Sequence, residues 1–166
     1  KGGGRNIMTG KYMAYVGSYS YTGKAKGITV FDVDVEQGKF IYRCEVEVDN
    51  SSYLKASNNR KILYSIADEG VVAFKILQNG SLSRLNSANI KGMRGCQIAT
   101  SKNDDYIFVS GYHDGKVTVL KLNKDGSVGR ITDGVFHKGL GSVAERNFRP
   151  HVSCSRMTPD EKFLMV

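Results

Sequence analysis

The sequence has little of what marks a membrane protein or a disulfide-rich secreted protein. Its 166 residues contain no apolar run near the roughly 20 residues that a membrane-spanning helix needs, and its start lacks the apolar core of a signal peptide. The three cysteines, Cys44, Cys96 and Cys154, are odd in number and have no CxxC spacing, which favours free thiols. We therefore expect a cytoplasmic protein whose residues 1–11 are a flexible leader or the remnant of an expression tag.

Proline, helical periodicity and the common catalytic signatures are also scarce. The chain has two prolines against 19 glycines and 9 tyrosines, a composition typical of short strands joined by tight turns. It has no GxSxG elbow, P-loop or metal-binding triad, so we expect no metal and no cofactor. The net charge of +8 favours anionic partners, but the lysines are scattered and no nucleic-acid motif occurs. We expect a small anionic ligand, and neither nucleic acid nor membrane.

What the chain does contain is a repeat. A turn followed by a strand, a second strand and a hairpin begins at Ser57 and again at Ser101, 44 positions later. This interval fits the roughly 40–50 residues of a four-stranded propeller blade. A further copy begins at Thr158, and the extra length before it lies in one connection, around residues 136–149. The repeat therefore predicts consecutive blades of one sheet architecture.

The strand at residues 12–17 aligns with residues 61–66 and 105–110, which are second strands of their blades. We predict an all-β fold, a β-propeller of four-stranded antiparallel blades over residues 12–166. It has the last three strands of a first blade, two complete blades and two strands of a fourth, about three and a quarter blades in all. The alternative is an unrelated series of hairpins in a β-sandwich. Open sheet edges lead us to expect that missing blades of the same protein, or self-association, cover them.

One rim of the predicted propeller collects polar residues, because strand direction alternates and two kinds of connection emerge on the same face. An arginine can hold phosphate or carboxylate with two parallel hydrogen bonds, and a histidine can move a proton near neutral pH. We assign catalysis to His151 and Glu69. The residues assigned to substrate binding are Arg146, Arg149, Arg94, Tyr19 and Tyr53. The alternative is that the histidine packs at a strand start, the glutamate serves a turn and the arginines are merely solvated.

Six short motifs, taken together in order and spacing, resemble the lactonase-type seven-bladed propellers, a family that includes one type of 6-phosphogluconolactonase and carboxymuconate cyclase. They are Tyr15-Val16-Gly17-Ser18-Tyr19, Gly27-Ile28-Thr29-Val30-Phe31, Ser52-Tyr53-Leu54, Asp68-Glu69-Gly70, Gly115-Lys116-Val117-Thr118-Val119 and Arg149-Pro150-His151. The resemblance covers residues 12–166 and implies the N-terminal half of a seven-bladed ring. The family's Ser-Pro-Asp-Gly blade turn is similar to the run that begins at Thr158.

The resemblance also implies roles for individual residues. His151 matches the first histidine of the family's Pro-His-x-His stretch, and Glu69 matches the glutamate of its Asn-Glu-Gly turn. Ser153 stands where the family has the second histidine, which carries the general base in the cycloisomerase relatives. Asn-Pro-Ser-Tyr is also changed, to residues 50–53, and Pro-Cys-His to residues 95–97.

Three functions remain open. The first is 6-phosphogluconolactonase-like hydrolysis of a phosphorylated or otherwise anionic sugar lactone by the complete propeller, with this part of the ring inactive alone. The second is a non-catalytic propeller that binds a small anionic metabolite or a protein, which Ser153 favours. The third is a cycloisomerase that acts on a carboxylated lactone, which Ser153 disfavours.

Overall fold

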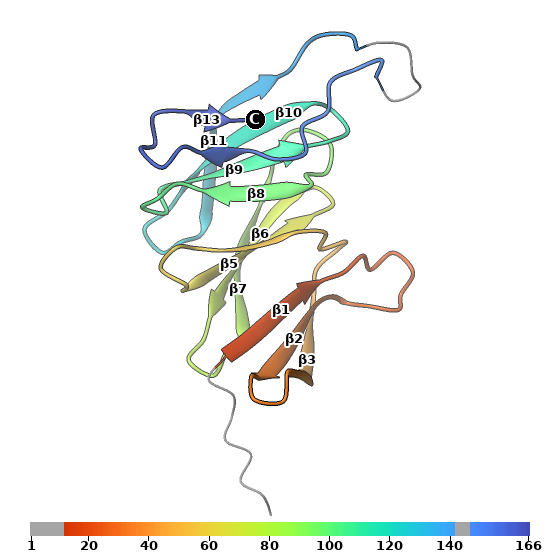
Figure 1. The fold of residues 1–166 in the computed structure, drawn as a ribbon, viewed down its shortest axis with the longest axis vertical. Helices are drawn as coiled ribbons and strands as arrows, with labels where there is room; N and C mark the ends of the chain where they lie inside the picture. The colour runs from red at the N-terminus through yellow and green to blue at the C-terminus, as the bar shows by residue number, and fades with distance from the viewer. Residues whose placement is uncertain (1–11, 142–146) are drawn as a thin grey trace, which may run out of the picture.

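The computed structural model describes residues 12–141 and 147–166, which form thirteen β-strands in four antiparallel sheets (Figure 1). The proposed leader, residues 1–11, lies outside the described residues. The first sheet comprises β1 (Tyr12–Gly17), β2 (Gly27–Asp34) and β3 (Lys39–Glu47). The second comprises β4 (Leu54–Ala56), β5 (Ile62–Ala67), β6 (Gly70–Ile76) and β7 (Leu82–Asn89). The third comprises β8 (Gln97–Thr100), β9 (Tyr106–Gly111), β10 (Lys116–Leu122) and β11 (Val128–Phe136), and the fourth comprises β12 (Arg156–Met157) and β13 (Leu164–Met165).

Each sheet is a simple meander in which consecutive strands are neighbours. The sheets follow one another in chain order, and each lies against the next (Figure 1). This arrangement confirms the predicted all-β propeller, because a sandwich would place its hairpins in two facing layers. The described part of the chain contains no helix.

The three larger sheets are built alike in detail. In each, the register between the last two strands shifts at the same place, namely Val30/Phe31, Ala73/Phe74 and Val119/Leu120. The hairpin glycines Gly80 and Gly126 have φ values of +79° and +84°, as the Asn-Gly and Asp-Gly pairs predict. A shared bulge and shared turns are what a repeated blade requires.

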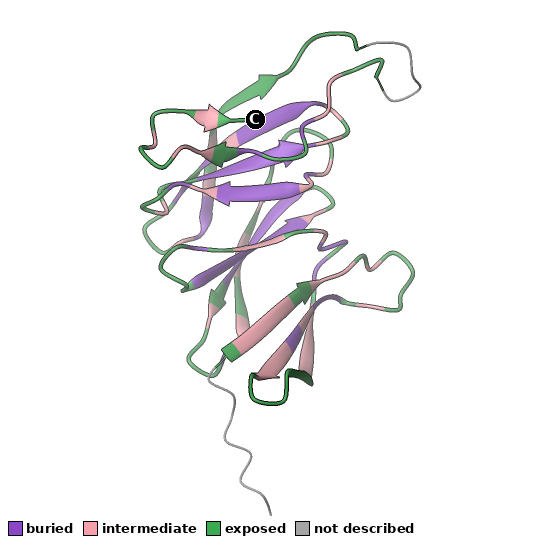
Figure 2. Cartoon of the chain, in the orientation of Figure 1, coloured by how far each residue is buried: buried purple, intermediate pink, exposed green. Residues whose placement is uncertain are grey.

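The hydrophobic core lies between sheets rather than within one layer. One cluster joins the second and third sheets and includes Ile66 and Ile107, which are both fully buried. A second cluster joins the first and second sheets and includes Ile28 and Phe74. Figure 2 shows the buried residues concentrated in the two complete sheets. Each such side chain contributes about 1.5–3 kcal/mol by leaving water, so packing between blades stabilises the array.

The connections predicted to share a rim do meet there. The backbone N–H of Ser20, after β1, donates to Asn50, before β4. Arg94, before β8, pairs with Asp68, after β5. These contacts bring residues from several blades to one rim, where the candidate site lies.

Candidate functional site

Asn50 is the centre of a hydrogen-bond set that joins separate connections of the rim. It is 8% exposed, and its φ of +50° is one that asparagine adopts more readily than most residues. Its Oδ1 accepts hydrogen bonds from the backbone N–H groups of Ser20 (2.9 Å) and Tyr21 (3.1 Å). Its Nδ2 lies 2.9 Å from each carboxylate oxygen of Asp68 and donates to them. One amide therefore links the connection after β1 to the connection after β5.

Asp68 in turn holds Arg94. Nη1 of Arg94 donates to Oδ1 of Asp68 at 3.0 Å, and the guanidinium carbon lies 5.0 Å from the ring centroid of Tyr19, a cation–π contact. The side chains of Arg94 and Asp68 are 30% and 48% exposed, so their ion pair adds little to stability. Its effect is directional, because it fixes where a group with several other N–H donors points. The structure thus brings together Arg94 and Tyr19, which were both predicted to bind substrate.

The loop between β7 and β8, which carries this arginine, is also held from the next blade. The backbone N–H of Met93 donates to Oδ2 of Asp114 at 2.9 Å. Lys116 is 8% exposed, and its Nζ donates to the carbonyl oxygens of Ile90 (2.9 Å) and Lys91 (3.0 Å). Residues of two adjacent blades therefore hold the loop.

His151 lies in the connection that leads to β12, the first strand of the fourth sheet, and is half-buried. Its ring stacks on Tyr112, with 4.2 Å between centroids and 13° between planes. Its Nδ1 lies 2.6 Å from the carbonyl oxygen of Tyr112. A carbonyl oxygen only accepts hydrogen bonds, so Nδ1 carries a proton, and in the neutral ring the basic nitrogen is then Nε2. This tautomer is the one that can accept a proton through Nε2.

Buried polar groups join the inner strands of the third and fourth sheets. The Ser110 hydroxyl donates to Oε1 of Gln97 at 3.0 Å, and the backbone N–H of Ser155 donates to the same oxygen at 3.1 Å. The thiol of Cys96 donates to the carbonyl oxygen of Val152 at 3.3 Å. Burial raises the pKa of Cys96, which outweighs the backbone hydrogen bonds that lower it. This cysteine therefore stays a thiol and is a poor nucleophile.

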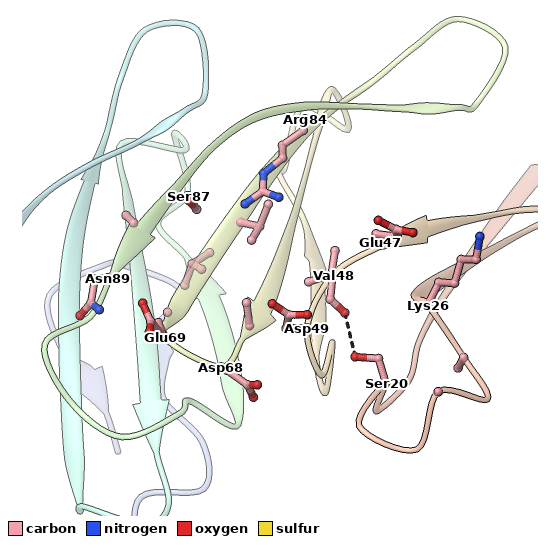
Figure 3. Close-up of a pocket in the computed structure, with 17 residues that line it drawn as sticks. Ser20, Lys26, Glu47, Val48, Asp49, Asp68, Glu69, Arg84, Ser87 and Asn89 are labelled. Carbon is pink, nitrogen blue, oxygen red and sulfur yellow. Dashed lines mark hydrogen bonds between the residues drawn. The ribbon is translucent and has the colours of Figure 1, made fainter.

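Glu69 directly follows Asp68 in the connection between β5 and β6. It is exposed and lines a groove of about 810 Å³ between the first and second blades. Figure 3 shows it with Asn89 on the second-blade side of this groove, while Lys26 and Glu47 lie on the first-blade side. No hydrogen bond or ion pair in the described part of the chain joins its side chain to His151. The two residues assigned to catalysis are thus not brought into contact.

The remaining predicted residues contribute less to the rim contacts. Tyr53 is 37% exposed. Arg149 is exposed, with its guanidinium carbon 5.2 Å from the ring centroid of Phe148. Arg146 lies outside the described residues. Ser153, at the second histidine position, is exposed.

No role in the site was predicted for Asn50 or Asp68 from the sequence. An asparagine between Asp49 and Ser51 gives no sign that its amide will contact a residue 18 positions later. Lys116 was also missed, because a lysine at the start of a strand normally extends into solvent.

The absence of a metal stays a prediction. Among the residues that the structure describes, no group of three or more histidine, cysteine or acidic side chains is placed to hold a metal ion. Within the same ranges, no helical segment has the length and apolar character that membrane crossing requires.

A family model described as "Lactonase, 7-bladed beta-propeller" matches residues 13–166. The chain belongs to this lactonase family. The matched residues include all four sheets, so the contacts described above lie within the part of the chain that matches the family.

Relatives of this lactonase chain agree with the family. It is 31% identical over 162 residues to the 6-phosphogluconolactonase of Bacillus subtilis, covering 94% of this chain and 46% of that protein. A solved structure from Bacteroides fragilis, provisionally named a 6-phosphogluconolactonase, is 34% identical with a TM-score of 0.83, and the match covers 92% of this chain and 43% of that one. The periplasmic gluconolactonase of Pseudomonas aeruginosa also has a TM-score of 0.83, over 92% of this chain and 45% of that one, and at 22% identity it supports the fold alone. The chain thus spans less than half the length of these relatives.

Proposed function

We propose that, within a complete propeller, this lactonase chain supplies part of a site that hydrolyses a phosphorylated sugar lactone, 6-phosphogluconolactone being the first substrate to test. The observation that carries the proposal is the hydrogen bond from Nδ1 of His151 to Tyr112, because it fixes the ring on the rim that also holds Arg94 and makes Nε2 the basic nitrogen of the neutral imidazole. The name of the Bacillus subtilis relative supports the choice of substrate.

In this proposal, Nε2 of His151 takes a proton from a water molecule while the water oxygen bonds to the lactone carbonyl carbon. The ring C–O bond then breaks, and the ring oxygen leaves as a hydroxyl after taking up that proton. The product is an open-chain hydroxy acid, whose carboxyl group releases a proton to solvent. Arg94 binds the substrate's phosphate with donors that its ion pair with Asp68 does not use. Glu69 has no step in this scheme, since it faces the groove between blades.

A second candidate is a propeller that binds an anionic metabolite without turnover. The specific observation in its favour is Ser153, an exposed hydroxyl where the family pattern has a second histidine. A serine hydroxyl alone is a weak base, so a mechanism that needs both histidines is incomplete here.

The deciding experiment uses the whole protein and three substrates: 6-phosphogluconolactone, its unphosphorylated analogue and a carboxylated muconolactone. Proton release measures hydrolysis, and an ultraviolet assay measures cycloisomerisation. Hydrolysis that prefers the phosphorylated lactone supports the proposal. Saturable binding of 6-phosphogluconate without turnover supports the second candidate, and cycloisomerisation alone contradicts both.

The cytoplasmic location expected from the sequence belongs to the same proposal. A phosphorylated sugar lactone formed inside the cell stays there, because charged phosphate esters do not cross membranes freely. Fractionation of cells that express the whole protein, with marker enzymes for each compartment, measures this directly. Recovery in a periplasmic or membrane fraction contradicts it.

A further inference from the structure

We propose that Asn50 and Asp68 are positioning residues that set the direction of the Arg94 guanidinium, an inference that rests on the proposed role of Arg94 in binding the substrate anion. None of the three was predicted to act through another. The chain of contacts runs from two backbone N–H groups, through one amide and one carboxylate, to the guanidinium.

The orientation of the Asn50 amide follows from its partners. Two backbone N–H groups, those of Ser20 and Tyr21, converge on one side-chain atom, so that atom must be the oxygen. The nitrogen therefore faces Asp68 and donates to it. Because Asn50 is 8% exposed, water cannot readily replace either set of hydrogen bonds.

Asp68 needs this support because it is itself half-exposed. A carboxylate on the surface turns freely about its last torsion unless something fixes its plane. The Asn50 Nδ2 lies 2.9 Å from both oxygens, so one donor fixes that plane. Oδ1 is then placed to receive Nη1 of Arg94 at 3.0 Å, while the guanidinium also makes a cation–π contact with the Tyr19 ring. Two contacts from different directions define the plane of the guanidinium.

The charges around Asp68 determine how its contact with Arg94 would respond to a carboxylate at position 50. Arg94 faces Asp68 directly. The charged side chains that line the adjoining groove are Lys26, Glu47, Asp49, Glu69 and Arg84, with acidic groups in excess. A carboxylate at position 50 would therefore meet repulsion from Asp68 that the local cations only partly offset.

Asn50→Asp separates the two functions of this residue. Aspartate keeps an oxygen for Ser20 and Tyr21, and it tolerates the φ of +50°. It replaces the N–H donor to Asp68 with a second carboxylate, so at pH 7.5 the two groups repel and Asp68 no longer holds Arg94 in one direction. At pH 5 two adjacent carboxylates share one proton, and an O–H donor takes the place of the lost N–H donor. The defect of this variant should therefore be relieved by acid.

Two further variants serve as controls. Asn50→Ala removes both sets of hydrogen bonds and offers no proton to share, so its defect should not be relieved at pH 5. Asn79→Asp makes the same chemical change in a hairpin turn between β6 and β7, where Oδ1 accepts from the backbone N–H of Ser81 at 3.0 Å. That turn is at the opposite rim, so this variant reports the effect of charge alone.

The first measurement does not depend on activity. In ¹⁵N NMR of the whole protein, the Arg94 Nη–H signals, assigned by their loss in Arg94→Lys, report how firmly the guanidinium is held, because Nη1 is the atom bonded to Asp68. The expected result is faster exchange in Asn50→Asp than in the wild type at pH 7.5, and equal exchange in the two proteins when both are measured at pH 5. Equal exchange in the wild type and Asn50→Asp at pH 7.5 overturns the proposal, whether or not the protein is a lactonase.

The second measurement is hydrolysis of 6-phosphogluconolactone, with each variant compared with the wild type at the same pH so that effects of His151 cancel. Loss of a charge-assisted hydrogen bond should raise KM about tenfold in Asn50→Asp at pH 7.5, with kcat changed less than about threefold. At pH 5 the KM ratio should fall toward one for Asn50→Asp but not for Asn50→Ala. A KM ratio for Asn50→Asp that stays high at pH 5 contradicts positioning. A fall in kcat as large as the rise in KM, in both variants, also contradicts it. A wild type without turnover refutes the proposed function and leaves the NMR result to decide the positioning claim.

Discussion

The hydroxyl of Tyr64 donates a 2.9 Å hydrogen bond to the carbonyl oxygen of Gly126 in the hairpin turn of the next blade. Tyr15 stands at the same place in the repeat, and its hydroxyl donates to the carbonyl oxygen of Gly80 at 2.7 Å. The same residue type thus joins successive blades twice, each time through the glycine that the turn requires. In the third blade the place is taken by Phe108, which has no hydroxyl to donate.

We expect Tyr64→Phe to destabilise the protein by about 1–2 kcal/mol, because a carbonyl oxygen at a packed interface loses its partner. Tyr106→Phe is the matched control, since that ring is 36% exposed and its removal of a hydroxyl should stay within about 0.5 kcal/mol. Urea unfolding followed by tyrosine fluorescence measures both. Equal midpoints for the wild type and Tyr64→Phe would show that the inter-blade bond is not stabilising.

The same tyrosine predicts a pH dependence. Burial raises the pKa of Tyr64 far above that of an ordinary phenol, and the nearby Asp104 and Asp125 carboxylates raise it further. The folded state therefore holds the phenol proton more tightly than the unfolded chain, whose tyrosines titrate near pH 10.0. This contribution to stability is complete below that pH and is lost as the pH rises above it. Unfolding between pH 9 and 11 should show a smaller loss in Tyr64→Phe than in the wild type, and parallel curves would contradict this.

In the second, third and fourth blades, the turn before the second strand contains a non-glycine residue in the left-handed region. Arg60, Asp104 and Glu161 have φ values of +58°, +57° and +56°. Asp104 uses this conformation, because its two carboxylate oxygens accept the backbone N–H groups of Asn58 (2.8 Å) and Asn59 (3.1 Å) in the preceding blade. The side chain of Arg60 makes no hydrogen bond or ion pair within the described ranges.

We therefore expect opposite effects of the same substitution at equivalent positions. Arg60→Gly should stabilise the protein by about 1 kcal/mol, because glycine adopts this conformation without strain. Asp104→Gly gains the same relief but loses two hydrogen bonds, so a net destabilisation of about 1 kcal/mol is expected. Thermal unfolding of the two variants side by side measures the difference. Stabilisation by both would mean that Asp104 does not hold the neighbouring turn.

Lys116 offers a test of how the rim loop is held. Lys116→Met keeps the length of the side chain but leaves two carbonyl oxygens, of Ile90 and Lys91, without their donor. A loss of about 2 kcal/mol is expected, with faster amide exchange confined to the loop between β7 and β8. Lys121→Met, at an exposed position of the same strand, should change stability by less than about 0.5 kcal/mol. Unchanged exchange in the loop would contradict this assignment.

The outward face of the first sheet predicts association. Phe31 occupies the place that Phe74 holds in the second sheet, where a neighbouring blade covers it and leaves it 1% exposed. Around Phe31 lie Phe40 and Tyr42, with ring centroids 5.6 Å and 6.4 Å away, and both are 62% exposed. The proposed cover is another blade of the same protein or a second copy. Light scattering of this chain alone should show concentration-dependent self-association that Tyr42→Lys weakens, and a monodisperse monomer would contradict it.

The propeller could be predicted from sequence because its signals are local. The interval from Ser57 to Ser101, and the glycines of the Asn-Gly and Asp-Gly turns, each depend on a few adjacent residues. Backbone geometry requires those residue types wherever the turn occurs. The position of the rim followed as well, since alternating strand direction alone decides which connections share a face.

The contacts within the site could not be predicted in the same way. Asp104 holds a turn 46 positions earlier, and Asn50 meets Asp68 across a separation of 18 positions. Such pairs depend on the packing between sheets, which no short motif encodes. Glu69 shows the same limit, because its motif alone does not indicate that its side chain lines a groove between two blades.

The most direct test of the account is the effect of His151→Ala on hydrolysis of 6-phosphogluconolactone by the whole protein, with His113→Ala as the control. Removal of a general base should lower kcat by about 10²–10⁴-fold with little change in KM, and the loss should not extend to His113→Ala. Circular dichroism and thermal unfolding confirm that both variants fold. A folded His151→Ala protein with wild-type kcat would remove His151 from the chemistry and contradict the proposed mechanism.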